Sequence, residues 1–464
     1  MEGAAITLQA LRSSEILRRS HSASVISARI AKRRTLAVTT TDRRPVEPRD
    51  VVATQDPNWL APWWKALPKR WGHRWHAMCS YLAMFPPGLP RYFIEQCSLP
   101  GDVVLDPFSG RGTTPLEACL AGRIGVGSDA NPLAAVLTAA KVCPPTKERA
   151  LERLSEIERS YARRKVDCVA PPEIKMLFDG RRTLPQLLYI RQILSHRSRC
   201  DTFLLAALLG ILHGNHPKRP TLSRTLSISM PNTFSMSPSY IERYKRREKL
   251  RKYPFDVFDL LRRRLNHLFH EAPPRVNGRA KEIDARAVDK WLPRASVSLI
   301  VTSPPYLRVV RYGKFNWIRL WLLKSSVENL DRRLRVEATD NALGLSDRLT
   351  FPSYCSFLRE VTESCSRVLK PGGQLILVIG DVRGNDGEDQ NLGQGLWKEI
   401  RRSSPLRLVD IIEDKIEVGA KVTRIWGSKK GTATKTDRVI VLKKPGHRAV
   451  KKLPPSDIID RLIR

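Results

Sequence analysis

The sequence lacks long apolar runs and has no cysteine pattern typical of a metal site or a disulfide framework. No stretch approaches the roughly 18 apolar residues that a transmembrane helix needs, so we expect no membrane span. The eight cysteines are scattered, with no CxxC pair and no Cys/His spacing that would bind zinc. We therefore expect no metal site and interpret the cysteines as reduced thiols of a cytosolic protein.

Acidic residues are few compared with basic ones. The 464-residue chain carries 46 Asp and Glu against 81 Lys and Arg, which gives a formal net charge of +35. This charge exceeds what solubility requires and indicates a polyanionic partner, because side chains that neutralise phosphates release bound counterions. Nucleic acid is the leading candidate, although a solvated surface in a basic proteome would have the same composition. Charge alone does not distinguish DNA from RNA.

The order of apolar and charged stretches predicts an α/β protein with a helical insert. Strand-length apolar runs alternate with helical stretches from residue 101 and again after residue 275, which favours a parallel sheet with helices on both faces. A basic arm rich in Arg and Ser precedes them; its composition also fits an organellar transit peptide, and we favour a disordered arm. The predicted parts are the N-terminal arm (1–55), a cofactor half (56–144), a helical basic insert (145–274), a catalytic half (275–447) and a C-terminal tail (448–464).

A glycine-rich turn follows the first predicted strand. In DPFSGRGTT, Gly110 and Gly112 lie between the apolar run 103–105 and a helix, where missing side chains let the backbone approach a ligand closely. Asp129 lies 17 residues beyond Gly112, at the end of the next apolar run, and an acid there can accept hydrogen bonds from both hydroxyls of a ribose. The spacing GxG argues against a dinucleotide and favours an adenosine-type cofactor.

Several segments together resemble the amino-group DNA methyltransferases. VLDPFSGRGTT and GVGSDANP resemble the cofactor motifs I and II of that family, TSPPY resembles its catalytic motif IV, and HAMCSYLAMF resembles its motif X. The resemblance implies a Rossmann-like methyltransferase fold, with a mostly parallel seven-stranded sheet, and S-adenosylmethionine as the cofactor. The cofactor-binding residues that it implies are Asp106, Phe108, Gly110, Gly112, Thr113, Asp129, Asp284 and Phe85, together with His76 from motif X.

The apolar run before residue 303 ends in two prolines, which cannot continue a strand. An exocyclic amine of a base is a poor nucleophile because its lone pair is delocalised into the ring, so an enzyme must orient that lone pair towards the methyl group. The hydroxyl of Ser303 and the carbonyl of Pro304 can accept the two amine N–H groups. Pro305 helps to fix that carbonyl, and Tyr306 can stack on a base flipped out of the duplex. A simple turn is the alternative for this motif.

The insert contains a strongly basic segment, 216–252, with ten Lys and Arg against two acidic residues. Its sequence SYIERYKRREKLRK predicts a helix that can contact phosphates or enter a groove, while a solvated helix face is the alternative. The insert lies between motif II and the strand before Asp284, which departs from the usual family order. The predicted nucleic-acid-binding residues are Arg243, Lys245, Arg246 and Arg247.

These features favour a site-specific DNA methyltransferase. Ser303 before PPY favours N4 of cytosine, by the family's tendency, and N6 of adenine is the alternative. Two further readings are a methyltransferase of tRNA or rRNA base amines and a nucleic-acid-binding protein on an inactive scaffold; the intact motif residues argue against the latter. We expect double-stranded DNA as the partner, a cognate restriction endonuclease as a further candidate partner, and a cytoplasmic, nucleoid-associated location in a bacterium.

Overall fold

The computed structural model describes most of the chain after residue 70. The described ranges are 71–81, 86–164, 166–216, 222–231, 235–305, 313–330, 351–380, 382–383, 389–390, 392–401, 403–415 and 436–446. The predictions for the two ends of the chain, for Phe85 and for Tyr306 lie outside these ranges. No helix within them is both long and apolar enough to cross a bilayer. Nor do three His, Cys, Asp or Glu residues gather there in a way that could hold a metal ion.

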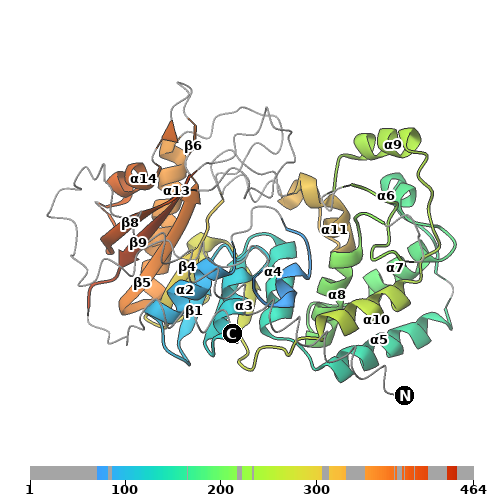
Figure 1. Cartoon of the computed structure of the whole chain (residues 1–464), viewed down its shortest axis with the longest axis horizontal. Coiled ribbons are helices and arrows are strands. Elements are labelled where there is room, and N and C mark those ends of the chain that lie inside the picture. The colour runs from blue at the N-terminus through green and yellow to red at the C-terminus, as the bar shows by residue number, and fades with distance from the viewer. Residues whose placement is uncertain are drawn as a thin grey trace, which may run out of the picture.

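A seven-stranded sheet organises one half of the molecule (Figure 1). Its strands, in spatial order, are β3 (Arg279–Glu282), β2 (Ile124–Asp129), β1 (Val103–Asp106), β4 (Val297–Thr302), β5 (Leu369–Gly380), β9 (Thr436–Lys443) and β8 (Arg407–Lys415). The five strands from β3 to β5 are parallel, whereas β9 is antiparallel to both of its neighbours. A separate short pair joins β6 (Val382–Arg383) to β7 (Asp389–Gln390).

Helices cover both faces of this sheet because successive strand residues point to opposite faces and are apolar on both. In β4, Leu299 and Val301 pack in one hydrophobic cluster, whereas Ile300 between them packs in another. On the Leu299 side lie α2 (Gly88–Cys97) and α3 (Thr113–Leu120). On the Ile300 side lie η5 (Ala285–Lys290), α13 (Phe351–Val368) and α14 (Leu392–Ile400). The predicted Rossmann-like fold class, mostly parallel with helices on both faces, is confirmed.

The strand order places a topological switch between β1 and β4. The chain builds outward from β1 through β2 to β3 and then returns to the other side of β1 with β4. Ligands of open α/β sheets bind at the carboxyl ends of the strands beside such a switch. The turn after β1, Asp129 at the end of β2 and the SPP sequence after β4 therefore share one edge of the sheet.

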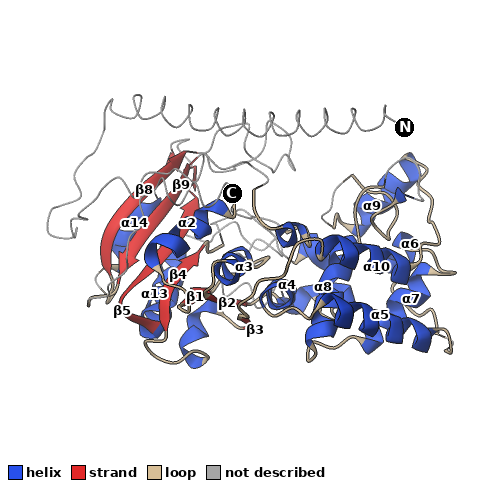
Figure 2. Cartoon of the chain, turned by 60° about the horizontal axis from the view of Figure 1, so that its bottom comes forward, coloured by secondary structure: helices blue, strands red, loops and turns tan. Residues whose placement is uncertain are grey.

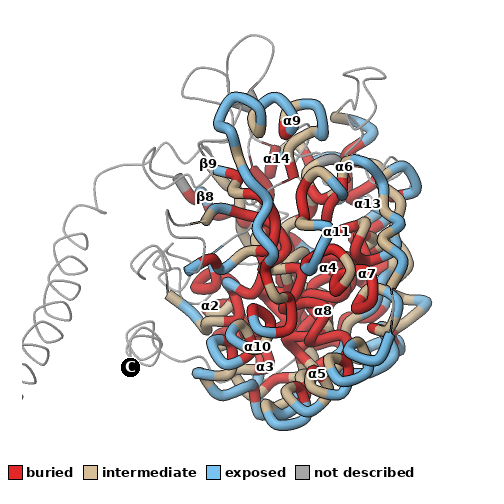
Figure 3. The backbone as a smooth tube through the Cα atoms, turned by 90° about the vertical axis from the view of Figure 1, so that its right-hand side faces the viewer, coloured by how far each residue is buried: buried red, intermediate tan, exposed pale blue. Residues whose placement is uncertain are grey.

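The other half of the molecule is helical and packs around α8 (Figures 1 and 3). Its helices are α5 (Lys147–Tyr161), α6 (Pro172–Leu177), α7 (Thr183–Ile193), α8 (Arg199–Ile211), α9 (Pro238–Arg247) and α10 (Val257–Leu268). Most of α8 is buried, because RCDTFLLAALLGI is apolar on all sides after its first turn. The short α11 (Trp317–Leu322), preceded by η6 (Lys314–Asn316), packs into the same cluster.

The helical insert is fixed against the cofactor half, as Figure 2 shows for α4 and α8. The helix α4 (Pro132–Val142) contacts β2 and β3 on one side and α8 on the other. At Gly210 in α8, an added Cβ would lie 1.9 Å from the carbonyl oxygen of Met78, so only glycine permits this approach. Met78 follows η3 (Arg74–Ala77), which means that α8 supports the segment before the glycine-rich turn 107–112, the predicted cofactor turn.

Candidate active site

The turn after β1 needs its two glycines for backbone reasons. Gly110 and Gly112 have φ angles of +50° and +78°, in the left-handed region that other residues rarely adopt. A Cβ on Gly112 would also lie 2.9 Å from the side-chain oxygen of Thr138 in α4. The amide of Ser109 donates to the carbonyl of Ser128, which fastens the turn to β2. The turn thus presents bare backbone at the carboxyl edge of the sheet.

Asp129 faces this turn from the end of β2. Its Oδ2 accepts a hydrogen bond from the amide of Gly110 at 2.9 Å, and its Oδ1 accepts one from the amide of Asn131, also at 2.9 Å. Burial raises the pKa of the Asp129 carboxyl to about 6. Each oxygen keeps a second lone pair, so the carboxylate can still accept two more hydrogen bonds.

Asp106 connects the cofactor strand with the strand that ends in SPP. Its Oδ1 accepts a 2.6 Å hydrogen bond from the hydroxyl of Thr302 and a 3.1 Å bond from the amide of Phe108. The side chain is buried, and burial raises its pKa to about 7. Because β1 and β4 are neighbouring parallel strands, this bond ties their two carboxyl ends together.

The SPP residues leave the sheet directly after Thr302. Ser303 and Pro305 are partly exposed, whereas Pro304 is buried. The carbonyl oxygen of Pro305 accepts a 3.0 Å hydrogen bond from the hydroxyl of Tyr354, a buried residue of α13. The sequence alone did not single out Tyr354, because the only local signal was a tyrosine on an amphipathic helix.

The other predicted cofactor residues lie around the same edge, in different settings. Phe108 packs against Phe357 of α13, with ring centroids 6.0 Å apart. Thr113 is buried at the start of α3, and its hydroxyl accepts a 3.3 Å bond from Arg111. Asp284 follows β3 and pairs with Arg286 at 2.6 Å. Although desolvation raises the pKa of Asp284, hydrogen bonds from Arg286 outweigh it and hold that pKa below its usual value.

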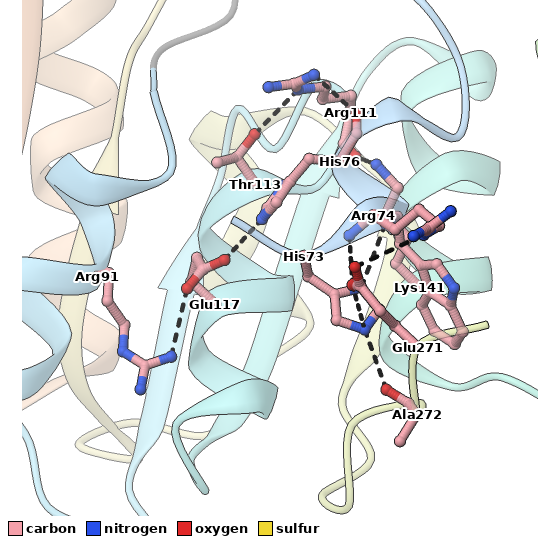
Figure 4. A network of polar contacts seen from close by, with 11 residues as sticks. His73, Arg74, His76, Arg91, Arg111, Thr113, Glu117, Lys141, Glu271 and Ala272 are labelled. Carbon is pink, nitrogen blue, oxygen red and sulfur yellow. Dashed lines mark hydrogen bonds and ion pairs between the residues drawn. The ribbon is translucent and has the colours of Figure 1, made fainter. Parts of the chain in front are cut away.

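A buried polar network clamps the segment before α2 to the cofactor turn (Figure 4). His76 lies 2.6 Å from Glu117 of α3, and Arg111 of the turn donates to the carbonyl oxygen of His76 at 2.7 Å. Lys141 of α4 donates in turn to the carbonyl oxygen of Arg111 at 2.5 Å. Burial lowers the pKa of His76 to about 4 and lowers that of Lys141 well below its usual range. His76 is thus placed to hold the turn in position.

Tyr81, at the end of the same segment, lies over the turn. Its ring would be 3.3 Å from a Cβ on Gly110, and its hydroxyl oxygen accepts a 3.1 Å hydrogen bond from the Asn131 side chain. Sequence reasoning chose Phe85 and His76 from this segment and overlooked Tyr81. HAMCSYLAMF contains more than one aromatic residue, and the sequence does not indicate which of these rings reaches the glycines.

The predicted basic helix is α9, at the outer end of the helical insert (Figure 1). Ile241 is its buried residue, and its last turn carries Lys245, Arg246 and Arg247. The rings of Tyr240 and Tyr244 stack 6.0 Å apart. In Figure 1, α9 lies at the outer end of the helical half, away from β4, the strand that precedes Ser303.

The segment before α9 is nevertheless fastened to the chain that follows the SPP loop. The indole of Trp317 donates to the carbonyl oxygen of Met236 at 2.8 Å. The amide of Ser235 donates to the carbonyl oxygen of Phe315 at 2.9 Å. The base of α9 is therefore fixed to η6 and α11.

Part of the chain matches a known protein family. Residues 28–138 match the family model N6_N4_Mtase, described as DNA methylase. The cofactor segment matches the amino-group DNA methyltransferases. The matched range includes the turn and Asp129 and ends before Ser303, so it covers the cofactor side of the site alone. For this segment the match confirms the predicted methyltransferase class and its cofactor, S-adenosylmethionine.

Similarities to solved structures are distant. A Thermus thermophilus protein named as a DNA modification methylase is 21% identical with a TM-score of 0.23, and the match covers 38% of this chain and 60% of that one. TrmN of Thermus thermophilus is 14% identical with a TM-score of 0.28, covering 80% and 52%. The rRNA methyltransferase aviRa of Streptomyces viridochromogenes is 12% identical with a TM-score of 0.28, covering 79% and 89%. Scores this low identify no substrate. No curated protein matches the chain.

Proposed function

We propose that this chain transfers a methyl group from S-adenosylmethionine to an exocyclic amine of a base flipped out of double-stranded DNA, with N4 of cytosine as the target. The observation that carries the proposal is the hydrogen bond between Thr302 and Asp106. It fixes the strand end that bears Ser303 beside the strand end that bears the cofactor turn. Reaction by in-line transfer requires the methyl donor and the amine to meet at such a place.

The described residues fit S-adenosylmethionine, which supplies a methyl group activated by its sulfonium when bound. Asp129 would accept hydrogen bonds from the ribose hydroxyls, because a lone pair on each carboxylate oxygen remains free of the Gly110 and Asn131 amides. Gly110 and Gly112 let the backbone approach the ligand, since neither carries a Cβ. The cofactor-side roles that we propose extend to Asp106, Phe108, Thr113 and Asp284, with Phe85 outside the described residues.

On the amine side, Ser303 and Pro304 would accept the two N–H bonds of the exocyclic amine. These acceptors localise the nitrogen lone pair towards the methyl group, and the amine loses one proton to solvent after transfer. Tyr354 holds the Pro305 carbonyl and so limits movement of the loop that presents these acceptors. Tyr306, outside the described residues, would stack on the flipped base. Precise positioning, and not a strongly basic group, would supply most of the rate enhancement.

The helical insert, 145–274, is the part that we propose for recognition of DNA. Its helix α9 carries exposed basic side chains next to a stacked pair of tyrosines, which suits contact with phosphates. The fastening of its base to η6 and α11 would keep it in a fixed relation to the catalytic half. A DNA substrate would place the enzyme at the nucleoid, with a nuclease of the same target site as a candidate partner.

The proposal is tested by identifying the methylated product. Purified protein and S-adenosylmethionine with a labelled methyl group are incubated with genomic duplex DNA and, in a parallel reaction, with tRNA and rRNA, and the digested nucleosides are analysed by mass spectrometry. N4-methylcytosine is the expected product. N6-methyladenine would replace the proposed base while keeping the reaction type. Labelled tRNA or rRNA with unlabelled DNA would overturn the proposed substrate.

A further inference from the structure

A concave site, apart from the candidate active site, lies between the helical insert and α11. Its volume is about 330 Å³, and it is formed by the end of α7, the connection to α8 and the end of α11. That volume is at the lower end of the range of small-ligand sites. Basic side chains that line it, which form its cationic walls, are those of Arg191, His196, Arg197 and Lys324. Apolar lining residues, which form its leucine floor, include Leu205 and Leu322.

The charges in this pocket are open to a ligand. Arg197 and Lys324 are exposed, and neither has a carboxylate partner in the part of the chain that the structure describes. Arg191 is held in place, since it donates to the carbonyl oxygen of Trp321 at 2.8 Å and lies over that indole ring at 5.3 Å. The pocket therefore combines one oriented guanidinium with these two exposed cationic side chains.

The pocket adjoins the sheet edge that carries the candidate active site. His196 lies within electrostatic reach of Glu282, which ends β3, and of Lys324. Glu282 is paired in register with Asp129 at the end of β2. The helix α11, which lines the pocket through Leu322, also packs through Leu320 against Ala130, the residue after Asp129. One helix thus lines the pocket and contacts the cofactor edge.

We propose that this pocket binds a backbone phosphate, together with the adjoining sugar, of the DNA strand whose base is methylated. This inference rests on the proposed function and adds a second anchor for its substrate. The cationic walls suit a phosphodiester, and the leucine floor suits the apolar face of a deoxyribose. A phosphate held here, beside the sheet edge, would fix the register of the strand while the target base leaves the duplex.

The test measures DNA affinity as a function of salt. The double variant Arg197→Gln,Lys324→Gln is compared with wild type by fluorescence anisotropy of a labelled duplex over a range of KCl concentrations. Loss of one phosphate contact should lower the slope of log affinity against log salt by about 0.9. The charge-conserving variant Arg197→Lys,Lys324→Arg should keep the wild-type slope, because both positive charges that would displace counterions remain.

A matched control removes one exposed lysine of α14 and one exposed arginine of β8, Lys398→Gln,Arg407→Gln, outside the helical insert and the candidate active site, and should leave the slope nearly unchanged. An equal change in the two Gln variants would overturn the pocket, since net charge alone would then explain the effect. An unchanged slope in the Arg197 and Lys324 variant would overturn it as well. A slope that falls on single-stranded RNA and not on duplex DNA would contradict the proposed occupant.

The salt-dependence test of the pocket can fail independently of the methyl-transfer test of the proposed function. Methyl transfer to DNA by wild type, with an unchanged slope in the pocket variant, would reject the pocket and keep the reaction. A lowered slope in a protein that methylates no DNA would keep the pocket as a DNA phosphate site and reject the reaction.

Discussion

The hydroxyl of Thr302 donates a 2.6 Å hydrogen bond to Oδ1 of Asp106, and this bond joins the ends of β4 and β1. The acceptor is a buried carboxyl whose pKa is raised to about 7, with burial as the main cause. A carboxylate in this position costs free energy when it is ionised, because it has left water for a less polar site. We infer that the site tolerates this cost to hold the two strand ends together.

The first prediction concerns stability and pH. The pKa of Asp106 is about 7 in the folded protein and 3.8 as its ordinary value, so the cost is full above pH 7 and vanishes as the pH falls towards 4. Asp106→Asn keeps an acceptor for Thr302 without the charge. Its free energy of unfolding, measured with denaturant, should therefore exceed that of wild type by up to about 4 kcal/mol at pH 8 and by little at pH 4.

The control for that experiment is Asp259→Asn, an exposed carboxylate of α10 that pairs with Arg263. It should gain no stability between pH 4 and pH 8 relative to wild type. A difference between Asp106→Asn and wild type that does not change with pH would contradict a raised pKa at Asp106.

The second prediction concerns cofactor binding. The pKa of Asp129 is raised to about 6, and its ionised form is the stronger acceptor for ribose hydroxyls. Calorimetric affinity for S-adenosylmethionine should rise from pH 5 to pH 7 and level off above. Asp129→Ala should weaken binding at pH 8 at least tenfold, since two hydrogen bonds at roughly 1.5 to 3 kcal/mol each are lost. Unchanged affinity in a folded variant would remove Asp129 from the cofactor site.

The third prediction concerns Tyr354. Tyr354→Phe removes the hydroxyl that donates to the Pro305 carbonyl and leaves the buried ring in place. We expect the methyl-transfer rate to fall roughly tenfold, as the loss of a bond of about 1 to 1.5 kcal/mol predicts, with unchanged affinity for S-adenosylmethionine. Tyr189→Phe, a matched change in the helical insert, should leave the rate unaltered. Equal effects of both changes would mean that Tyr354 does not position the loop.

The fourth prediction concerns α9. Replacing Arg243, Lys245, Arg246 and Arg247 with Gln should lower DNA affinity and reduce the salt slope by up to about 3.6, at roughly 0.9 per phosphate contact. Ile241 keeps the helix packed, because the substitutions leave its buried side untouched. A wild-type slope would place α9 outside the DNA interface.

The parts of the fold and site that the sequence could predict are those with local causes. Gly110 and Gly112 are required by the turn's own backbone, and alternating strand-length and helical stretches predicted the sheet with helices on both faces. The prolines after Thr302 end β4 for the same local reason.

The contacts that escaped prediction are made between segments far apart in the chain. Tyr354 reaches Pro305 across 49 positions, and the Tyr81 hydroxyl meets Asn131 across 50. Tyr354 stands in no motif, and Tyr81 stands in the motif X segment without being distinguished there; each is placed only when α13 or the segment before α2 packs on the sheet. Nothing in the sequence around Lys141 predicts its burial, because that burial depends on how α4 packs against the cofactor turn.

The measurement that tests the account most directly is single-turnover methyl transfer to duplex DNA by Ser303→Ala, with affinity for S-adenosylmethionine measured on the same preparation. The account predicts transfer about tenfold to a hundredfold slower than wild type, since an acceptor worth roughly 1.5 to 3 kcal/mol in the transition state is lost, and unchanged cofactor affinity. Transfer at the wild-type rate would contradict the assignment of this strand end as the place where the methyl group meets the base.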